Sequence, residues 1–392
     1  MVNFDYNTPT YVLFGKGTEA EVGKLVKGQG CKKVLVHFGE GSVKRSGLLD
    51  RVYASLDESG ISYVSLGGVV PNPRLAKVNE GIELCKKEGV DFILAVGGGS
   101  AIDSAKTIGY GVACGGDVWD FFDGKREVTA AIPVGVILTI SAAGSEMSNS
   151  AVITNEDGWH KRGCGTEFGR PKFSILNPEL TYTLPPYQTA SGVVDIMMHT
   201  MDRYFITDDT LELTDEIAEG LLRVVMKNCS VSINDATDYM ARAEVMWAGS
   251  LAHNGLTGCG NGAGDWAPHQ LEHELGGLYD VAHGAGIAAI WGTWARYVYK
   301  EKPARFARFA KNVMGVEDKG CDETTALAGI EAMEAYFRSI GMPVSIGDMG
   351  ITPTDAEIGE MADKCARYGK RTIGGFKTLN RDDIAKIYTQ AK

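Results

Sequence analysis

The chain has 392 residues, of which 44% are hydrophobic, and its formal net charge is −11 at pH 7. Because domains usually hold about 100 to 200 residues, this length predicts two domains with ample sequence for buried cores. The acidic balance and the lack of a basic run argue against nucleic acid or an anionic membrane as partner, since both bind clustered Lys and Arg. We expect small-molecule partners.

The sequence also indicates a cytoplasmic protein. The eight cysteines are scattered without a Cys-x-x-Cys pair, which is typical of free thiols in a reducing compartment. The first residues lack the basic stretch and apolar run of a secretory signal. No segment reaches the roughly eighteen apolar residues that a membrane span requires.

Short apolar runs alternate with amphipathic stretches in the first half of the chain. The runs predict buried strands at 34–38, 62–66, 92–96 and 132–138. The stretches between them predict helices such as 48–58 and 76–87. Continuous hydrophobicity in the strands is typical of a parallel sheet that is covered on both faces. We therefore predict a doubly wound, mostly parallel α/β dinucleotide-binding domain over residues 1–184.

A glycine turn follows the first clear strand and consists of Gly39, Glu40, Gly41 and Ser42. In a doubly wound sheet this position reads the adenosine ribose of a dinucleotide or its 2′-phosphate. Ser42 and the following Lys44 and Arg45 suit a 2′-phosphate. Glu40 suits free ribose hydroxyls and would repel the phosphate. A polar surface loop is the alternative interpretation.

A second turn, after the strand at 92–96, consists of Gly97, Gly98, Gly99 and Ser100 and leads into a helix. Successive glycines let backbone N–H groups approach a phosphate, and the helix presents its positive end to it. The turn matches neither the Gly-x-Gly-x-x-Gly fingerprint nor a Walker loop. We predict a pyrophosphate site, with a simple tight turn as the alternative.

A third turn follows the strand at 132–138 and contains Thr139 and Ser141. Its hydroxyl and amide groups predict a contact with the nicotinamide half of a dinucleotide at the carboxyl edge of the sheet. Helix capping by Ser141 or Ser145 is the alternative. Beyond Asn177 the alternation stops, and 215–228, 236–254 and 324–339 show helical periodicity. We predict a mostly helical domain over residues 185–392.

Five metal-capable side chains form two clusters in this helical half: Asp195 and His199, then His269, His273 and His283. Residues four apart share one helix face, so Asp195 with His199, and His269 with His273, each project a pair of donors in one direction. Two such pairs can close on one divalent ion. The alternative is ordinary buried polar residues that hydrogen-bond within their helices.

These motifs together resemble the iron-containing (group III) alcohol dehydrogenases, and within them the butanol dehydrogenase-like aldehyde reductases. The most specific part is Asp-x3-His followed by His-x3-His-x9-His. The resemblance runs over nearly the whole chain and includes Pro9 to Gly17, Pro71 to Arg74, Gly97 to Ser100 with Asp103 and Lys106, Gly144 to Glu146, and the tail Gly374-Gly-Phe376. It implies a dinucleotide-binding domain, a helical domain and a metal in the cleft between them.

The resemblance also assigns roles to residues. It implies that the metal ligands are Asp195, His199, His269 and His283, that His273 lies beside the nicotinamide, and that Asp103 belongs to the cofactor site. Three imidazoles and one carboxylate suit Fe2+ and also accept Zn2+. His273 is expected to relay the proton, with a structural role as the alternative. The resemblance further suggests a homodimer.

Two positions depart from the pattern of the family. Glu40 stands where NADPH-using members commonly have glycine, so it weakens the slight preference for NADP(H) over NAD(H) that the rest of its turn suggests. Ala143 stands where many members have threonine, which removes one hydroxyl group near the cofactor. Neither position belongs to the metal set.

We therefore predict a metal-dependent oxidoreductase that transfers a hydride between NAD(P)H and short- or medium-chain aldehydes or primary alcohols. One alternative is a dinucleotide- and metal-dependent lyase of the dehydroquinate synthase kind. Such a lyase would need several Lys and Arg residues in the helical half to hold a phosphorylated, carboxylated substrate. The segments around the metal ligands contain few of these residues. A metal hydrolase with purely structural glycine turns and a catalytically silent binding protein are further alternatives.

Overall fold

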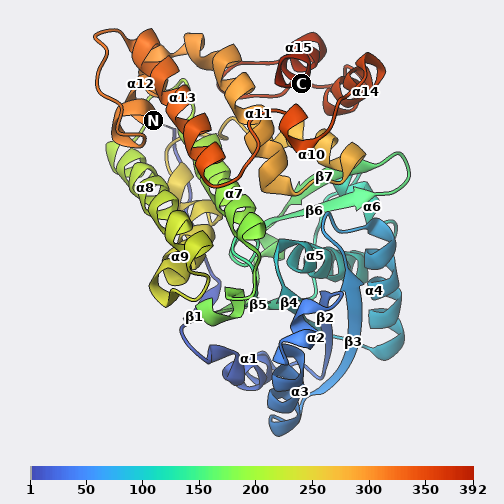
Figure 1. Ribbon diagram of the computed structural model, residues 1–392. Helices are drawn as coiled ribbons and strands as arrows, with labels where there is room; N and C mark the ends of the chain where they lie inside the picture. Colours follow the sequence, from blue (N-terminus) through green and yellow to red (C-terminus); the bar gives the residue numbers. More distant parts are fainter. Residues whose placement is uncertain (1) are drawn as a thin grey trace. The chain divides into compact units, whose positions relative to one another are not determined.

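The computed structural model describes residues 2–392, which form two compact units (Figure 1). The amino-terminal unit is Thr8–Thr183, and the carboxyl-terminal unit is Leu184–Lys392 together with residues 2–7. The Val2 N–H, for example, donates to the Gly260 carbonyl at 3.0 Å. The division into domains near residue 184 stays a prediction, and residues 2–7 group with the second unit.

A six-stranded parallel sheet forms the centre of the amino-terminal unit. Its order across the sheet is β1 (Tyr11–Phe14), β8 (Phe173–Leu176), β5 (Val134–Leu138), β4 (Phe92–Gly97), β2 (Lys33–Gly39) and β3 (Ser62–Val69). An antiparallel hairpin, β6 (Ser150–Asn155) with β7 (His160–Gly165), stands apart from it. The parallel α/β prediction is confirmed. The sequence missed β1 and β8, which have four residues each and give little periodicity to read.

Helices connect these strands. They are η1 (Thr18–Glu21), α1 (Val22–Gly28), α2 (Ser42–Arg45), α3 (Leu48–Glu58), α4 (Leu75–Glu88), α5 (Gly99–Cys114), α6 (Trp119–Phe122), η2 (Glu167–Gly169) and η3 (Pro178–Thr181). The central strands β2 and β4 are buried over almost their whole length, as continuous hydrophobicity predicts. The edge strand β3 is half-exposed.

The carboxyl-terminal unit is helical, as predicted. Its elements are α7 (Pro186–Tyr204), α8 (Glu212–Asn234), α9 (Tyr239–His253), η4 (Leu256–Gly258), α10 (Ala267–Tyr279), α11 (His283–Val298), η5 (Tyr299–Glu301), α12 (Pro303–Asn312), α13 (Asp322–Ser339), η6 (Gly347–Met349), α14 (Asp355–Cys365) and α15 (Arg381–Ala391). Helix α11 carries the buried Trp291 and Trp294 and packs against α7, α10, α13 and α15. Among residues 2–392, no helix is both long and apolar enough to cross a membrane.

The strand order creates a switch point in the sheet. The chain leaves β2 towards β3 on one side and leaves β4 towards β5 on the other, while β2 and β4 are neighbours. In open α/β sheets a crevice opens at such a reversal, outside the carboxyl ends of the strands. The turns after β2 and β4 are therefore in the position where a dinucleotide is expected.

A buried histidine joins β2 to the helix that follows the second turn. The ring of His37 has no exposed surface and contacts the Leu66 carbonyl (2.9 Å from Nδ1) and the Ser104 hydroxyl (2.8 Å from Nε2). A neutral ring satisfies both partners, because Nδ1–H donates and Nε2 accepts. Burial, with a smaller contribution from Lys77, lowers the pKa of His37 to about 4.

This histidine predicts acid sensitivity. In the unfolded chain His37 takes up a proton below about pH 6.5, whereas in the folded chain it stays neutral down to about pH 4. The free energy of unfolding therefore falls by up to about 3 kcal/mol over that range. Urea unfolding between pH 7 and pH 5 would measure this loss. The His37→Gln variant should be less stable at pH 7 but lose less stability on acidification. Equal slopes for the two proteins would contradict the assignment.

Candidate functional site

Helix α7 projects three polar side chains from one face. Asp195, His199 and Asp202 are spaced i, i+4 and i+7, which places them in one row along the helix. Each is at most 5% exposed. This row faces the helices that carry the other predicted donors, because α7 packs against both α10 and α11.

Four predicted metal donors converge at this row. The Asp195 Oδ1 atom lies 3.3 Å from Nδ1 of His199, 3.5 Å from Nε2 of His269 and 3.6 Å from Nε2 of His283. Donors about 2.1 Å from a tetrahedral ion lie about 3.4 Å from one another. Each of the three distances to Asp195 fits this spacing, and the donor atoms of Asp195, His199 and His269 all lie within 4.8 Å of one another.

The hydrogen bonding of these donors also fits an ion. Asp195 Oδ1, His199 Nδ1 and His269 Nε2 are buried and make no hydrogen bond. Buried polar atoms are normally paired, because leaving one unpaired costs about 1–3 kcal/mol. Three unpaired atoms that point at one another are better explained by a shared cation than by packing. Imidazole nitrogens with one carboxylate are a donor set for Fe2+ or Zn2+.

Two carboxylates orient the imidazoles of His269 and His283 by contacting their Nδ1 atoms. Asp202 Oδ2 lies 2.5 Å from Nδ1 of His269, and Glu272 contacts Nδ1 of His283 through its Oε2. When Nδ1–H donates to a carboxylate, the Nε2 lone pair is left for a metal and becomes more basic. The sequence analysis missed both residues. The signal was present, since Asp202 is three residues after His199 and Glu272 is three residues after His269.

Charge in the cluster favours a cation. Burial lowers the pKa of His269, but Asp202 and Asp195 outweigh it and raise that pKa to about 9. Burial, with His269 and Arg203, holds the pKa of His199 well below its usual value. The cluster therefore stabilises positive charge, yet keeps at least one imidazole neutral and able to bind a metal.

Two aromatic rings lie against His199, and one of them, that of His253, was not predicted from the sequence. The ring centroid of His253 is 4.0 Å from that of His199 in an edge-on arrangement, and that of Trp266 is 6.2 Å away. Trp266 adopts a left-handed conformation with φ of 62° directly before α10. No local spacing links His253 on α9 to this cluster.

His273 lies beside the four converging donors. Its half-buried ring is 5.9 Å, centroid to centroid, from that of His283. It forms a second group with Glu272 and His283, whose donor atoms lie within 4.8 Å of one another. His283 is thus close to both groups, and the division between metal ligands and a separate histidine stays a prediction.

The predicted cofactor turns lie at the carboxyl ends of three neighbouring strands. β2 ends at Gly39, β4 ends at Gly97 and β5 ends at Leu138. The Thr139 N–H donates to the Gly97 carbonyl at 3.0 Å, so the second and third turns lie directly side by side. A Cβ atom on Gly98 would come within 2.0 Å of Ile140. Glycine is therefore needed there for packing, whether or not a phosphate binds.

The second turn is braced through the helix that follows it. Both Asp103 carboxylate oxygens accept hydrogen bonds, from the Ser145 hydroxyl at 2.5 Å and from the Val152 N–H at 2.9 Å. The fully buried Lys106 donates to Ser145 at 2.9 Å and to the Ser150 carbonyl at 2.8 Å. Asp103 thus ties α5 to the segment after the third turn, and its direct contact with a cofactor stays a prediction.

The turn after β2 is open to solvent. Glu40 and Ser42 are exposed, while Ser141 in the third turn is buried. The two cations of the turn are folded back: Lys44 Nζ lies 5.3 Å from the Phe38 ring centroid, and Arg45 lies against Gly41. Glu40, Lys44 and Arg45 are all exposed, but only the two cations lie against neighbouring groups of the turn.

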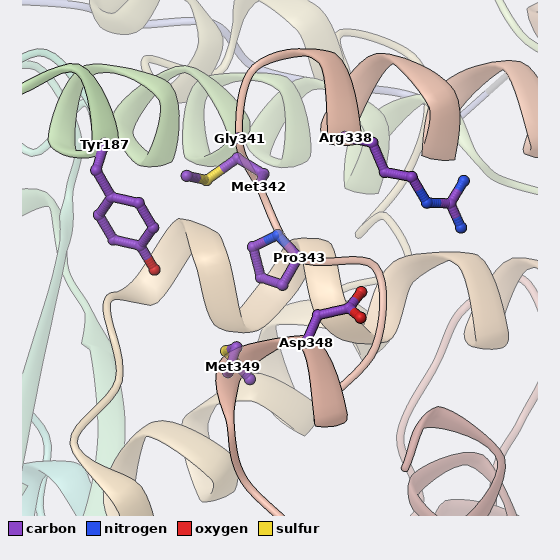
Figure 2. A pocket seen from close by; sticks show the side chains of 7 residues that line it. All are labelled: Tyr187, Arg338, Gly341, Met342, Pro343, Asp348 and Met349. Carbon is purple, nitrogen blue, oxygen red and sulfur yellow. The ribbon is translucent and has the colours of Figure 1, made fainter.

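A surface pocket of about 330 Å³ lies elsewhere in the carboxyl-terminal unit (Figure 2). It is lined by Tyr187, Arg338, Gly341, Met342, Pro343, Asp348 and Met349. None of the predicted site residues is among them, and Figure 2 shows the Arg338 side chain running away from Tyr187. We place the chemistry at the converging donors, because unpaired buried atoms indicate a ligand more directly than a hollow does.

Comparison with known proteins identifies the family. The protein-family model described as iron-containing alcohol dehydrogenase matches residues 9–178. A second family model, described as Fe-containing alcohol dehydrogenase family, C-terminal, matches residues 189–392. NADH-dependent butanol dehydrogenase A of Clostridium acetobutylicum is 40% identical, over 100% of both chains. NADPH-dependent aldehyde reductase YqhD of Escherichia coli is 33% identical, again over 100% of both chains.

A solved structure agrees with these relatives. The crystal structure of NADH-dependent butanol dehydrogenase A from Thermotoga maritima matches with a TM-score of 0.96 and 41% identity, covering 100% of this chain and 99% of that one. The chain belongs to the iron-containing alcohol dehydrogenase family.

Proposed function

We propose that the chain transfers a hydride between NAD(P)H and short- or medium-chain aldehydes or primary alcohols, with Fe2+ at Asp195, His199, His269 and His283. The observation that carries the proposal is that the three histidines each place a ring nitrogen within 3.6 Å of Asp195 Oδ1. Three of these four donor atoms, on Asp195, His199 and His269, are buried and make no hydrogen bond. Relatives at 40% and 33% identity are named butanol dehydrogenase and aldehyde reductase, which supports the same substrate class. Zn2+ suits the donor set as well.

Different residues of the chain would have separate roles in this reaction. A divalent metal, when bound, supplies a Lewis acid that polarises a carbonyl group. Asp202 and Glu272 hold the Nε2 atoms of His269 and His283 towards the ion. As the hydride reaches the aldehyde carbon, the carbonyl oxygen gains a negative charge and needs one proton. His273 would supply that proton from a ring nitrogen and regain it from solvent, since its ring is half-buried.

Metal reconstitution tests this function. Protein stripped by a chelator and reloaded with Fe2+ or Zn2+ without oxygen should oxidise NADH or NADPH with butyraldehyde, and the stripped protein should not. His269→Ala and His283→Ala should lose both metal and turnover. His273→Ala should keep the metal and lose roughly 100-fold in rate.

The control for this test is His160→Ala, on the β7 strand of the hairpin, which should behave as wild type. Metal content is read by elemental analysis and turnover by absorbance at the cofactor band. A His283→Ala protein with full metal and full activity would overturn the ligand assignment.

We propose that the pyrophosphate of the dinucleotide binds at Gly97 to Ser100 and that Glu40 sets the choice of cofactor. The sequence slightly favours NADP(H) through Ser42, Lys44 and Arg45. The exposed Glu40 carboxylate, the folded-back cations and two relatives at 40% identity that are named NADH-dependent support the opposite order. We therefore propose that the wild-type enzyme prefers NADH.

The Glu40→Gly variant tests this choice. A carboxylate about 4 Å from a 2′-phosphate is repelled by about 1 kcal/mol or more, so its removal should raise kcat/KM for NADPH roughly tenfold and leave that for NADH within a few-fold. Steady-state rates with both cofactors at one ionic strength measure the ratio. Glu58→Gly, at the exposed end of α3, serves as a charge-matched control. An unchanged ratio would remove Glu40 from cofactor selection.

We propose that the enzyme is a homodimer joined through the outer edge of β1. This strand pairs with β8 on one side, and its Tyr11 and Phe14 side chains are 57% and 38% exposed. An edge strand with exposed apolar side chains is a template for pairing with another chain. Sedimentation should give a dimer for wild type and a monomer for a Tyr11→Lys, Phe14→Lys double variant. Phe168→Lys, an exposed apolar position in the same unit, should remain dimeric.

We also propose a cytoplasmic location. All eight cysteines are unpaired in the structure, and burial raises the pKa of Cys85 and Cys365 to about 12. Eight cysteines without a disulfide support a reducing compartment.

A further inference from the structure

The tail turn Gly374-Gly375-Phe376 is a closed structure that lies far from the metal donors in sequence. Ile373 and Leu379 exchange backbone hydrogen bonds of 3.1 and 2.8 Å across it. Phe376 is 3% exposed, and its ring centroid is 5.3 Å from that of Phe306 in the core. The turn is therefore fixed in one conformation and anchored in the carboxyl-terminal unit.

A single buried carboxylate holds this turn to the start of α10. Asp265 is 3% exposed, and its Oδ2 accepts the Phe376 N–H at 2.7 Å. Its Oδ1 accepts the N–H of Ala267, the first residue of α10, at 2.9 Å. The same side chain thus accepts the first backbone N–H of the helix that carries His269 and ties that helix to a segment 111 residues later.

The glycines of the turn permit this close approach. A Cβ atom on Gly375 would lie 2.4 Å from the Gly264 carbonyl oxygen, and one on Gly374 would lie 2.3 Å from the Lys377 carbonyl oxygen. Backbone atoms cannot yield to such overlaps as a flexible side chain can. Only a turn without side chains at these positions can lie on Gly264 and Asp265.

Asp265 is also connected, through Asp202, to the candidate metal ligand His269. Its N–H donates to the Asp202 carbonyl at 2.7 Å, and Asp202 in turn holds Nδ1 of His269 at 2.5 Å. We propose that Asp265 is a positioning residue of the metal centre, which clamps the tail turn, α10 and Asp202 together so that His269 points at the ion. This inference rests on the metal site proposed above.

An asparagine cannot take over this role. Burial and the nearby Asp202 raise the pKa of Asp265 to about 7, while the backbone N–H groups that it accepts act in the opposite direction. The side-chain amide of an Asp265→Asn variant would offer one acceptor oxygen and one NH2 group. One buried backbone N–H would then face another donor and lose its partner.

The test measures metal binding instead of turnover. Apo protein is titrated with Co2+, and its visible absorption reports binding and geometry. Asp265→Asn and Gly375→Ala disturb the clamp from its two sides, and each should weaken binding about tenfold, in the range of 10–100-fold known for residues that orient ligands. Asp202→Asn is the positive control.

The matched negative control is Asp383→Asn. Asp383 lies in the first turn of α15, just after the same tail turn, and accepts from the Asn380 N–H and the Tyr297 hydroxyl. It should bind Co2+ as wild type does. Folded Asp265→Asn and Gly375→Ala proteins with wild-type affinity would reduce the clamp to a stabilising contact and overturn the proposal.

Hydrogen exchange in the wild-type protein tests the same link without any substitution. Coupling between two sites is reciprocal, so Co2+ bound at the donors should slow exchange at the Phe376 N–H. No change at Phe376 while Co2+ is bound would also overturn the proposal, even if the variants do not fold. Failure of wild type to bind Co2+ at all would instead overturn the metal centre.

Discussion

The carboxyl-terminal unit is organised around polar atoms that are buried without partners. Asp195, His199 and His269 each present such an atom to the same point, beside the large apolar core of this unit. Burial of a carboxylate and several imidazoles is unfavourable unless each is paired or binds a metal. The positions of α7, α10 and α11 follow from this constraint, because each helix must bring its donors to that point while it buries its apolar face.

The amino-terminal unit meets a different constraint, which is backbone topology. Its candidate cofactor residues lie in turns whose positions are set by strand order: β5, β4 and β2 are adjacent and parallel, so their carboxyl ends share one edge. Little side-chain chemistry is needed to assemble such a site. Where side chains do contribute, as with Asp103, Lys106 and Ser145, they join one turn to the next.

The sequence predicts what is local in the chain. Helical spacing was enough to pair Asp195 with a histidine one turn later, and apolar runs located the central strands. Asp202 and Glu272 lay in register with the ligands, but carboxylates are so common on helices that spacing alone does not single them out. The clamp at Asp265 could not be predicted, because its partner Phe376 is 111 residues away and a glycine pair in a tail has many other uses. Contacts of this kind depend on the assembled core.

The proposed metal site would link metal binding to the stability of the fold. Asp195, Asp202, Glu272 and Asp265 place four acidic groups in one buried region, and Asp202 and Asp195 raise the pKa of His269 to about 9, which favours its positively charged form. In the apo protein protons must supply that charge, whereas a divalent ion would supply it at every pH where the imidazoles are neutral. An ion that binds the folded chain alone stabilises it by about 2.7 kcal/mol at 100 times its Kd. At the proposed metal centre the same donors would serve catalysis and would also help to hold α7, α10 and α11 together.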